Sequence, residues 1–473
     1  MNRTSSSTVP LSRETIERPE IAMAIAEIAA LVGDRITTSR GIREEHGRDI
    51  THHRSMPPDA VVFPLDTAET ARIVSICARH RVPVIAYGTG TSLEGHISAP
   101  LGGISVDMSR MDAVLRVSAE DMDVVVQPGV TRLALNRYVR DTGLFFPIDP
   151  GADASIGGMA ATRASGTNAV RYGTMRDNVM ALEVVLPDGT IIRTGTRARK
   201  SSAGYDLTRL FVGSEGTLGI ITELTIRLHG IPEKIAAASC PFTTLAGAVG
   251  TVIAILQLGI PIARIELMDD VQIAAVNDYF GMDLPVLNTL WMEFHGSERA
   301  VDEQVELVEE IAQAHGAGAF RWTKDQEDRT RLWKARHEAV WANKSRCPGY
   351  AMLPTDVCVP ISRLTECIAE TKDDIARSGL FAPLLGHVGD GNFHLTIFYD
   401  PDEETQRSRA FELSDSLVKR AIAMGGTCTG EHGIGRGKID YLRQEHGPAV
   451  DLMRRIKQVI DPTGILNPMK IFE

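Results

Sequence analysis

Two histidines that flank a glycine-rich turn constrain this chain more than any other stretch. His387 and His394 are separated by Val-Gly-Asp-Gly-Asn-Phe. On an unbroken strand this odd spacing would place the two imidazoles on opposite faces. Glycine lets the backbone turn tightly, so the 389–391 segment removes that restriction. Polar and apolar residues then alternate through Tyr399, which predicts a strand buried on one side.

A second glycine-rich segment, residues 425–435, carries Glu431 and His432. Two histidines and one carboxylate form a ligand set that leaves coordination positions on a divalent metal open for substrate. We therefore expect His387, His394 and Glu431 to bind a divalent metal, zinc or manganese. The structural alternative stays open, because a histidine beside a strand is often simply hydrogen-bonded.

Three segments rich in glycine and small residues occupy the first half of the chain: 88–95, 155–168 and 213–219. The first follows a predicted strand over 82–87, and such a loop exposes backbone N–H groups that can bind a pyrophosphate. The nicotinamide fingerprint G-x-G-x-x-G would require glycine at Leu93. A phosphate-binding loop is expected here and a Rossmann NAD site is not; the alternative is a plain glycine turn.

Composition narrows the class of protein. The net charge of −11 gives no sign of the basic surface that nucleic-acid binding requires, so no nucleic acid is expected. The six cysteines contain no Cys-x-x-Cys pair and suit a reducing compartment. The start lacks the apolar core of a secretory signal, and the longest apolar segment, 21–32, contains Glu27. We expect a soluble cytoplasmic protein, with peripheral contact to the inner membrane left open.

Beyond residue 232 the glycine loops give way to strands and charged helices, which indicates a second α+β domain. Arg331 and Arg336 lie on a predicted helix with two tryptophans and are candidates to bind a carboxylate, although a helix arginine is more often solvated. We expect helices over 244–257, 300–314, 329–341 and 406–424, and strands over 262–268, 289–295 and 355–360.

Seven segments together resemble flavoproteins of the vanillyl-alcohol-oxidase/PCMH superfamily: 88–95, 149–158, 213–219, 355–362, 386–394, 426–435 and 465–470. The chain is most similar to the branch of D-lactate dehydrogenase (cytochrome), the glycolate oxidase FAD subunit and other D-2-hydroxyacid dehydrogenases. The resemblance implies an α+β fold with a PCMH-type FAD-binding domain of two α+β subdomains, an α+β cap domain and a C-terminal segment that returns to the flavin. The expected boundaries are an N-terminal helical segment (1–54), the FAD-binding domain (55–232), the substrate or cap domain (233–420) and the C-terminal segment (421–473).

The resemblance also implies roles for individual residues. His387, His394 and Glu431 match the family's metal ligands. His432 matches its catalytic base, and Arg336 matches the arginine that pairs with the substrate carboxylate. Covalent attachment of FAD at His52 or His53, as in some relatives, has no other support in the sequence. The residues matched to FAD binding are Gly88, Thr89, Gly90, Thr91, Ser92, Pro150, Gly151, Ser155, Gly157, Gly158, Ser165, Gly166, Glu215, Gly216, Gly219, Ile221 and Asn467.

The implied activity is oxidation of D-lactate or a related D-2-hydroxy acid to the 2-oxo acid by hydride transfer to flavin N5. The implied acceptor is cytochrome c, a quinone or an electron-transfer protein, and a homodimer is left open. The hydroxyglutarate enzymes carry lysine and threonine where this chain has Pro354 and Val340, so a second carboxylate would be buried unpaired. Met469 replaces the usual glycine of the C-terminal tail. A glycolate oxidase FAD subunit, a D-2-hydroxyglutarate dehydrogenase and a metal-dependent hydrolase without redox chemistry stay as alternatives.

Overall fold

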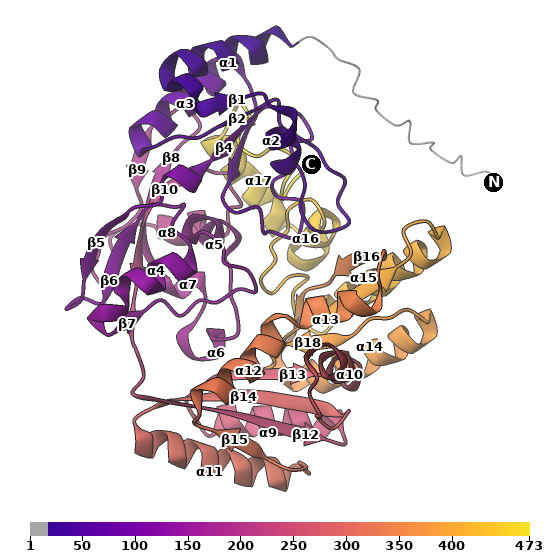
Figure 1. The fold of residues 1–473 in the computed structure, drawn as a ribbon. Helices are drawn as coiled ribbons and strands as arrows, with labels where there is room; N and C mark the ends of the chain where they lie inside the picture. The colour runs from indigo at the N-terminus through magenta and orange to yellow at the C-terminus, as the bar shows by residue number, and fades with distance from the viewer. Residues whose placement is uncertain (1–17) are drawn as a thin grey trace.

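The structure, a computed structural model, describes residues 18–473, so the first part of the predicted N-terminal segment, residues 1–17, lies outside the described residues. The fold is α+β, as predicted. In Figure 1 two smaller sheets form the upper part of the molecule and one large sheet forms the lower part. The C-terminal segment, drawn in yellow, lies between these two parts.

The first sheet has the order β1-β2-β4-β3, with β2, β4 and β3 parallel and β1 antiparallel at the edge. Helix α3 begins where the side chain of Asp66 accepts a hydrogen bond from the backbone of Glu69. Ile28 and Val74 bring α1 and α3 into the same core, so residues of the predicted N-terminal segment pack on this sheet. The elements are α1 (Pro19–Val32), β1 (Ile36–Thr37), α2 (Arg40–Glu45), β2 (Ala60–Val62), α3 (Thr67–His80), β3 (Val84–Tyr87) and β4 (Ile104–Asp107).

The second sheet is antiparallel and has the order β5-β6-β10-β8-β9. A separate two-stranded ribbon joins β7 to β11. The strands are β5 (Val114–Ser118), β6 (Asp123–Val126), β7 (Leu144–Phe145), β8 (Val179–Val185), β9 (Ile191–Arg193), β10 (Ile220–Arg227) and β11 (His229–Gly230). The helices are α4 (Arg132–Val139), α5 (Ile156–Thr162), α6 (Ala169–Tyr172), α7 (Met175–Asn178) and α8 (Leu207–Phe211).

The large sheet has the order β15-β12-β14-β13-β18-β19-β16, and β17 also pairs with β19. Its strands are β12 (Lys234–Phe242), β13 (Ile262–Met268), β14 (Asn288–Gly296), β15 (Arg321–Thr323), β16 (Ala351–Pro354), β17 (Val357–Cys358), β18 (Leu384–Gly386) and β19 (Asn392–Tyr399). Its helices are α9 (Leu245–Gln257), α10 (Asp270–Phe280), α11 (Glu298–Ala314), α12 (Gln326–His337), α13 (Ala339–Arg346), α14 (Leu364–Ser378) and α15 (Glu404–Ala423).

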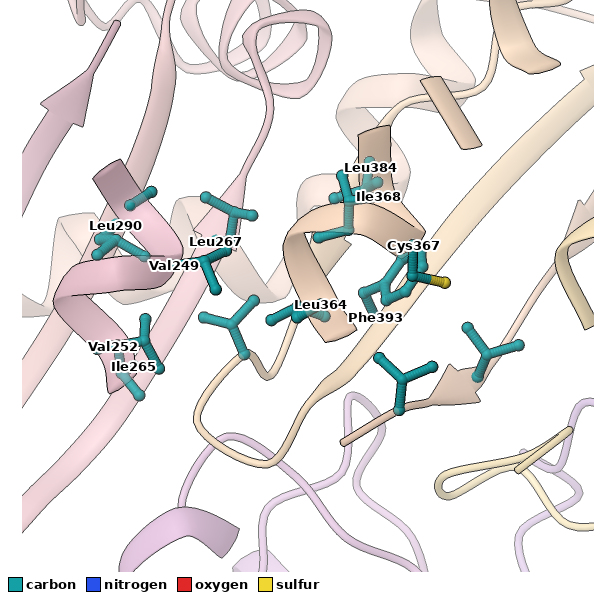
Figure 2. Packing of buried hydrophobic residues seen from close by; sticks show 14 of the residues in the cluster. Val249, Val252, Ile265, Leu267, Leu290, Leu364, Cys367, Ile368, Leu384 and Phe393 are labelled. Carbon is teal, nitrogen blue, oxygen red and sulfur yellow. The ribbon is translucent and has the colours of Figure 1, made fainter. Parts of the chain in front are cut away.

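Alternation along the strands separates two apolar layers in this domain. Ile265 and Leu267 of β13 join α9, α11, α14 and α15 in the main core, and Figure 2 shows this packing around Val249 and Leu364. Met268 joins α10, α12 and α13 in a smaller cluster around Trp291 and Trp333. Burying one leucine- or isoleucine-sized side chain in these layers stabilises the fold by ~2 kcal/mol.

The C-terminal segment contains α16 (Ile439–His446) and α17 (Ala449–Ile460) and ends on the first sheet. There Val84 donates its N–H to the carbonyl of Ile465 and accepts from the N–H of Asn467, each at 2.8 Å. The C-terminal segment therefore pairs with β3 at the edge of the first sheet. Strand β3 leads directly into the first glycine-rich loop.

Three local predictions are wrong. Strand β19 is buried on both faces, because the face that carries His394 is covered by the 429–432 loop. The predicted helix 329–341 is two helices that meet at Glu338, whose backbone (φ −93°, ψ 11°) leaves the helical region. Of the predicted strand 355–360, only Val357–Cys358 (β17) is a strand, and the preceding strand β16 ends at Pro354.

Candidate active site and metal centre

Strand register brings the two predicted histidine ligands together. Leu267 of β13 opposes Gly386 of β18, and Leu385 opposes His394 of β19. The turn before β19 requires glycine, because Gly391 has φ +78° and a Cβ there would lie 2.1 Å from the carbonyl oxygen of Val359. This turn places the His387 ring 5.4 Å from the His394 ring.

Glu431 completes the predicted ligand set. Its Oε1 lies 3.3 Å from His387 Nε2 and 3.4 Å from His394 Nε2. One ligand atom from each of the three residues lies within 4.8 Å of the other two. His394 Nε2 and Glu431 Oε2 are buried and form no hydrogen bond within residues 18–473. Unpaired buried polar atoms are costly, and a divalent cation would satisfy both, so the donor set fits the expected metal.

The charges of this cluster are strongly coupled. Burial opposes a proton on His387, but the carboxylates of Glu266 and Glu431 outweigh burial and raise the pKa of His387 well above its usual range. Burial likewise opposes ionisation of Glu431, yet His387 and His394 hold the pKa of that carboxyl well below its usual range. A divalent cation at this position would compete with the imidazole proton.

His432, the predicted base, stacks on His394 with ring centroids 5.2 Å apart. Its Nδ1 is buried and without a hydrogen bond in the described part of the chain, and it lies 4.0 Å from Oε1 of Glu94. Burial lowers the pKa of His432, although Asp356 partly opposes this effect. An imidazole that is neutral near pH 7 can accept a proton, as a general base must.

Asp356 holds the loop that carries Glu431 and His432, and the sequence reasoning assigned it no role. Its Oδ2 accepts the backbone N–H of both residues at 2.9 Å and the hydroxyl of Thr429 at 2.7 Å. Its Oδ1 accepts a hydrogen bond of 2.7 Å from the side-chain amide of Asn392, the first residue of β19. The interruption between β16 and β17 gives Asp356 this position. The available signal was a carboxylate inside the predicted strand 355–360.

The two candidate arginines differ in their exposure to solvent. Arg331 is exposed, whereas Arg336 is buried and donates from Nε to Oε2 of Glu266 at 2.8 Å. Glu266 also accepts from Nδ1 of His387 at 2.6 Å. The sequence reasoning missed Glu266, although a carboxylate inside the predicted strand 262–268, which is apolar apart from Arg264 and Glu266, marks an unusual buried charge.

The three predicted glycine-rich segments meet in one cleft between β3, α5 and β10. Gly88 and Gly157 have no room for a side chain, because a Cβ would lie 2.3 Å from Ser155 Oγ and 2.4 Å from Pro128 Cβ respectively. A close approach of backbone to a flat or phosphorylated group needs such surfaces, so the cleft fits FAD. The predicted residues that line it are Gly88, Ser155, Gly157, Gly158, Gly216, Gly219 and Ile221.

The other predicted FAD residues lie outside the lining of that cleft. Thr89, Gly90, Thr91 and Ser92 continue the first loop, and the hydroxyl of Ser92 is buried without a hydrogen bond in the described chain. Pro150, Gly151, Ser165 and Gly166 lie in the loops on either side of α5. Their roles, and those of Glu215 and Asn467, stay predictions.

Glu215 uses its carboxylate to hold the C-terminal loop. The backbone N–H groups of Ile434 and Gly435 each donate to it at 2.7 Å. This contact connects the third glycine-rich segment to the loop of His432. Asp149 connects the second glycine-rich segment to the large sheet, because it accepts from the Thr167 hydroxyl at 2.6 Å and from Arg264 Nη2 at 3.2 Å.

Two features around the tryptophans of α12 and α13 were not expected from the sequence. Trp341 is 53% exposed, because the break at Glu338 turns it away from the core where Trp333 packs. A second cation, which the sequence reasoning did not find, lies there: the Arg264 guanidinium sits 4.6 Å from the Trp333 ring. Asp149 at 3.2 Å and Glu293 at 3.6 Å surround that guanidinium with negative charge.

Comparisons with known proteins agree with this arrangement. Residues 58–195 match the family described as "FAD binding domain", and residues 231–471 match "FAD linked oxidases, C-terminal domain". "Probable D-lactate dehydrogenase, mitochondrial" of Danio rerio is 51% identical, over 96% of this chain and 92% of the relative. "D-lactate dehydrogenase [cytochrome], mitochondrial" of Arabidopsis thaliana is 47% identical, over 94% and 79%.

Solved structures confirm the predicted PCMH-type fold. p-Cresol methylhydroxylase with substrate bound superposes with a TM-score of 0.80 at 20% identity, over 96% of this chain and 97% of that chain. Within residues 18–473, no helix combines the length and apolarity that crossing a membrane requires.

Proposed function

This chain belongs to the FAD-linked oxidase family, and on that premise we propose that it is a D-lactate dehydrogenase that uses a divalent metal and a histidine base. One observation carries the proposal: a buried His387–His394–Glu431 ligand set lies against the imidazole ring of His432. The names of two relatives, 51% and 47% identical, supply the substrate class.

Each residue has a distinct task in this reaction. When bound, FAD supplies the two-electron acceptor and a divalent ion supplies a Lewis acid. His432 takes the proton of the substrate hydroxyl, which its lowered pKa permits. Arg336 binds the substrate carboxylate and so fixes which face of the α-carbon meets the flavin. Asp356 keeps the base and Glu431 in register through their backbone N–H groups.

The charges around the proposed substrate-binding residues favour a substrate with one carboxylate. Pro354 pairs with Thr396 in the β16–β19 ladder and offers no charge. Arg264, the second cation near Trp333, is neutralised by Asp149 and Glu293. A buried carboxylate without a charge partner costs ~3 kcal/mol, which corresponds to roughly a hundredfold in specificity. D-lactate is therefore expected to be a better substrate than D-2-hydroxyglutarate.

The test is kcat/KM for D-lactate, L-lactate, glycolate and D-2-hydroxyglutarate with a dye or cytochrome c as acceptor. We expect D-lactate to exceed D-2-hydroxyglutarate and L-lactate by about a hundredfold. A preference for glycolate would favour a glycolate-oxidising subunit instead. A preference for D-2-hydroxyglutarate would overturn the substrate assignment and identify Arg264 as the second carboxylate partner.

Anaerobic D-lactate should bleach the visible absorption of the flavin within one turnover. An unchanged flavin spectrum together with hydrolytic activity would favour the non-redox metal enzyme. The physiological acceptor is proposed to be a cytochrome, a quinone or an electron-transfer protein. The cytoplasmic location, with or without contact to the inner membrane, is a proposal of the same kind, and so is a homodimer.

A further inference from the structure

We infer that Glu266 is a positioning residue that holds both the metal-ligand histidine His387 and the substrate-binding arginine Arg336. The inference rests on the proposed metal and substrate sites and adds a residue that links them. Glu266 has no exposed surface, and it lies on β13 on the face opposite Ile265 and Leu267. Extension of the β13–β18 register by one residue places it opposite His387.

The contact with His387 fixes which ring nitrogen meets the metal. Glu266 Oε1 lies 2.6 Å from His387 Nδ1, and a carboxylate can only accept a hydrogen bond. Nδ1 therefore carries a proton, which leaves Nε2, 3.3 Å from Glu431 Oε1, as the ring nitrogen that a metal would bind. A carboxylate behind a ligating imidazole orients the ring and raises its basicity as a ligand.

The contact with Arg336 fixes the direction of the guanidinium. Nε and Nη2 lie 2.8 and 2.5 Å from the same oxygen, Glu266 Oε2. Nη1 makes no hydrogen bond to any residue in the described range, 18–473. The planar guanidinium can therefore offer its remaining edge to a carboxylate while Glu266 holds the other edge. One buried carboxylate thus sets the geometry of two groups that must contact the same substrate.

The adjacent strand β14 contains a matched arrangement away from the metal ligands. Glu293 is buried, accepts from His295 Nε2 at 2.7 Å and lies 3.6 Å from Arg264 Nη1. Both clusters consist of a buried glutamate, a histidine and an arginine. Glu293→Gln is therefore a control for the general cost of removing a buried charge from this sheet.

The experiment compares Glu266→Gln, Glu266→Asp, Arg336→Gln and Glu293→Gln as FAD-loaded proteins. Flavin absorbance per chain reports correct folding. Dissociation constants for Zn²⁺ and Mn²⁺ are measured by chelator competition, and kcat and KM for D-lactate are measured at saturating metal. Glu266→Asp keeps the negative charge, but its shorter side chain cannot reach both His387 and Arg336. This variant replaces Glu266→Gln in the comparison if Glu266→Gln does not retain flavin.

We expect both Glu266 variants to bind metal about 10- to 100-fold more weakly and to raise KM. Arg336→Gln should raise KM while metal affinity stays within about threefold, and Glu293→Gln should leave metal affinity unchanged. Wild-type metal affinity in the Glu266 variants, or an equal loss in Glu293→Gln, would overturn the inference. A wild-type protein that binds neither ion would overturn the proposed metal site and this inference together.

Discussion

The side-chain amide of Asn467 donates a hydrogen bond of 2.7 Å to the backbone carbonyl of Glu215. Both residues have positive φ, 41° and 54°, although neither is glycine. Glu215 lies within the third glycine-rich segment, and its carboxylate holds the loop of His432 at Ile434 and Gly435. Through its backbone carbonyl and its carboxylate, Glu215 therefore joins the C-terminal tail and the proposed catalytic loop to the FAD-binding domain.

The same tail contains a strained position at Met469, where φ is +59° and the resembling family usually has glycine. A left-handed backbone costs a residue with a side chain roughly 1 kcal/mol, and glycine avoids this cost but loses more chain entropy on folding. Met469→Gly should therefore leave stability unchanged or raise it by up to ~1 kcal/mol, whereas Met469→Val should lower it by ~1 kcal/mol.

Urea unfolding of the FAD-loaded protein measures these differences. Met23, which is exposed within helix α1, is the control of opposite sign: Met23→Gly should destabilise by ~1 kcal/mol. Equal destabilisation by Met469→Gly and Met469→Val would mean that side-chain contacts, and not the backbone, hold this position.

Gly157 provides a test of the proposed FAD cleft. A valine there would place its Cβ 2.4 Å from Pro128 Cβ and would fill the surface between α5 and β10. Gly157→Val should therefore lose most of its bound flavin, measured as visible absorbance per chain. Gly41→Ala, at a site where a Cβ meets no atom within 4 Å, should keep it. Full flavin content in Gly157→Val would show that FAD does not approach this segment.

The glycine loops and the histidine turn were predictable because each is a local pattern. Gly391 has a positive φ within the run that the sequence marks as a turn, and His387 and His394 sit on either side of it. Glu266 and Asp356 were not predictable in their roles, because their partners are distant in the chain. Glu266 meets His387 across 121 positions and Asp356 meets His432 across 76. Such contacts depend on sheet register, which no local pattern specifies.

The sequence also did not indicate which faces of its strands and helices other segments would cover. Alternation in β19 predicted one solvent-facing side, but the 429–432 loop packs over His394. Helix periodicity predicted one helix over 329–341, whereas the two tryptophans belong to different environments on either side of Glu338. The hydrophobic periodicity of a segment indicates its amphipathic character, but it does not indicate which other segments pack against it.

Loss of the proposed metal should separate turnover from flavin binding. His394→Ala removes a ligand but lies outside the glycine cleft, so the variant should lose D-lactate turnover by a factor of about 100 or more and keep its flavin spectrum. The metal content of the variant should then fall from about one ion per chain toward zero. His446→Ala, on the surface of α16, is the control that should behave as wild type. Undiminished turnover in metal-free protein would overturn the assignment.

The pH dependence of stability has a defined contribution from His229, which lies far from the proposed metal ligands in the sequence. Burial, with a smaller effect of Arg227, lowers the pKa of His229 to about 4. In the unfolded chain this histidine has an ordinary pKa near 6.5, so between about pH 6.5 and 4 the unfolded state binds more protons than the folded state. The free energy of unfolding therefore decreases as the pH falls through this range. Between pH 7 and 5 the loss is at most ~2 kcal/mol, and less where solvent reaches the partly buried ring.

His229→Gln should reduce the change in the urea midpoint between pH 7 and pH 5. The comparison must be with wild type, because His52, whose pKa burial also lowers to about 4, contributes in the same window. The introduced amide cannot gain a proton in this range, although it loses part of the contact with Asn178 and so lowers stability at pH 7. If His229→Gln has the same slope as wild type, the buried ring does not exclude a proton and the acid sensitivity arises elsewhere.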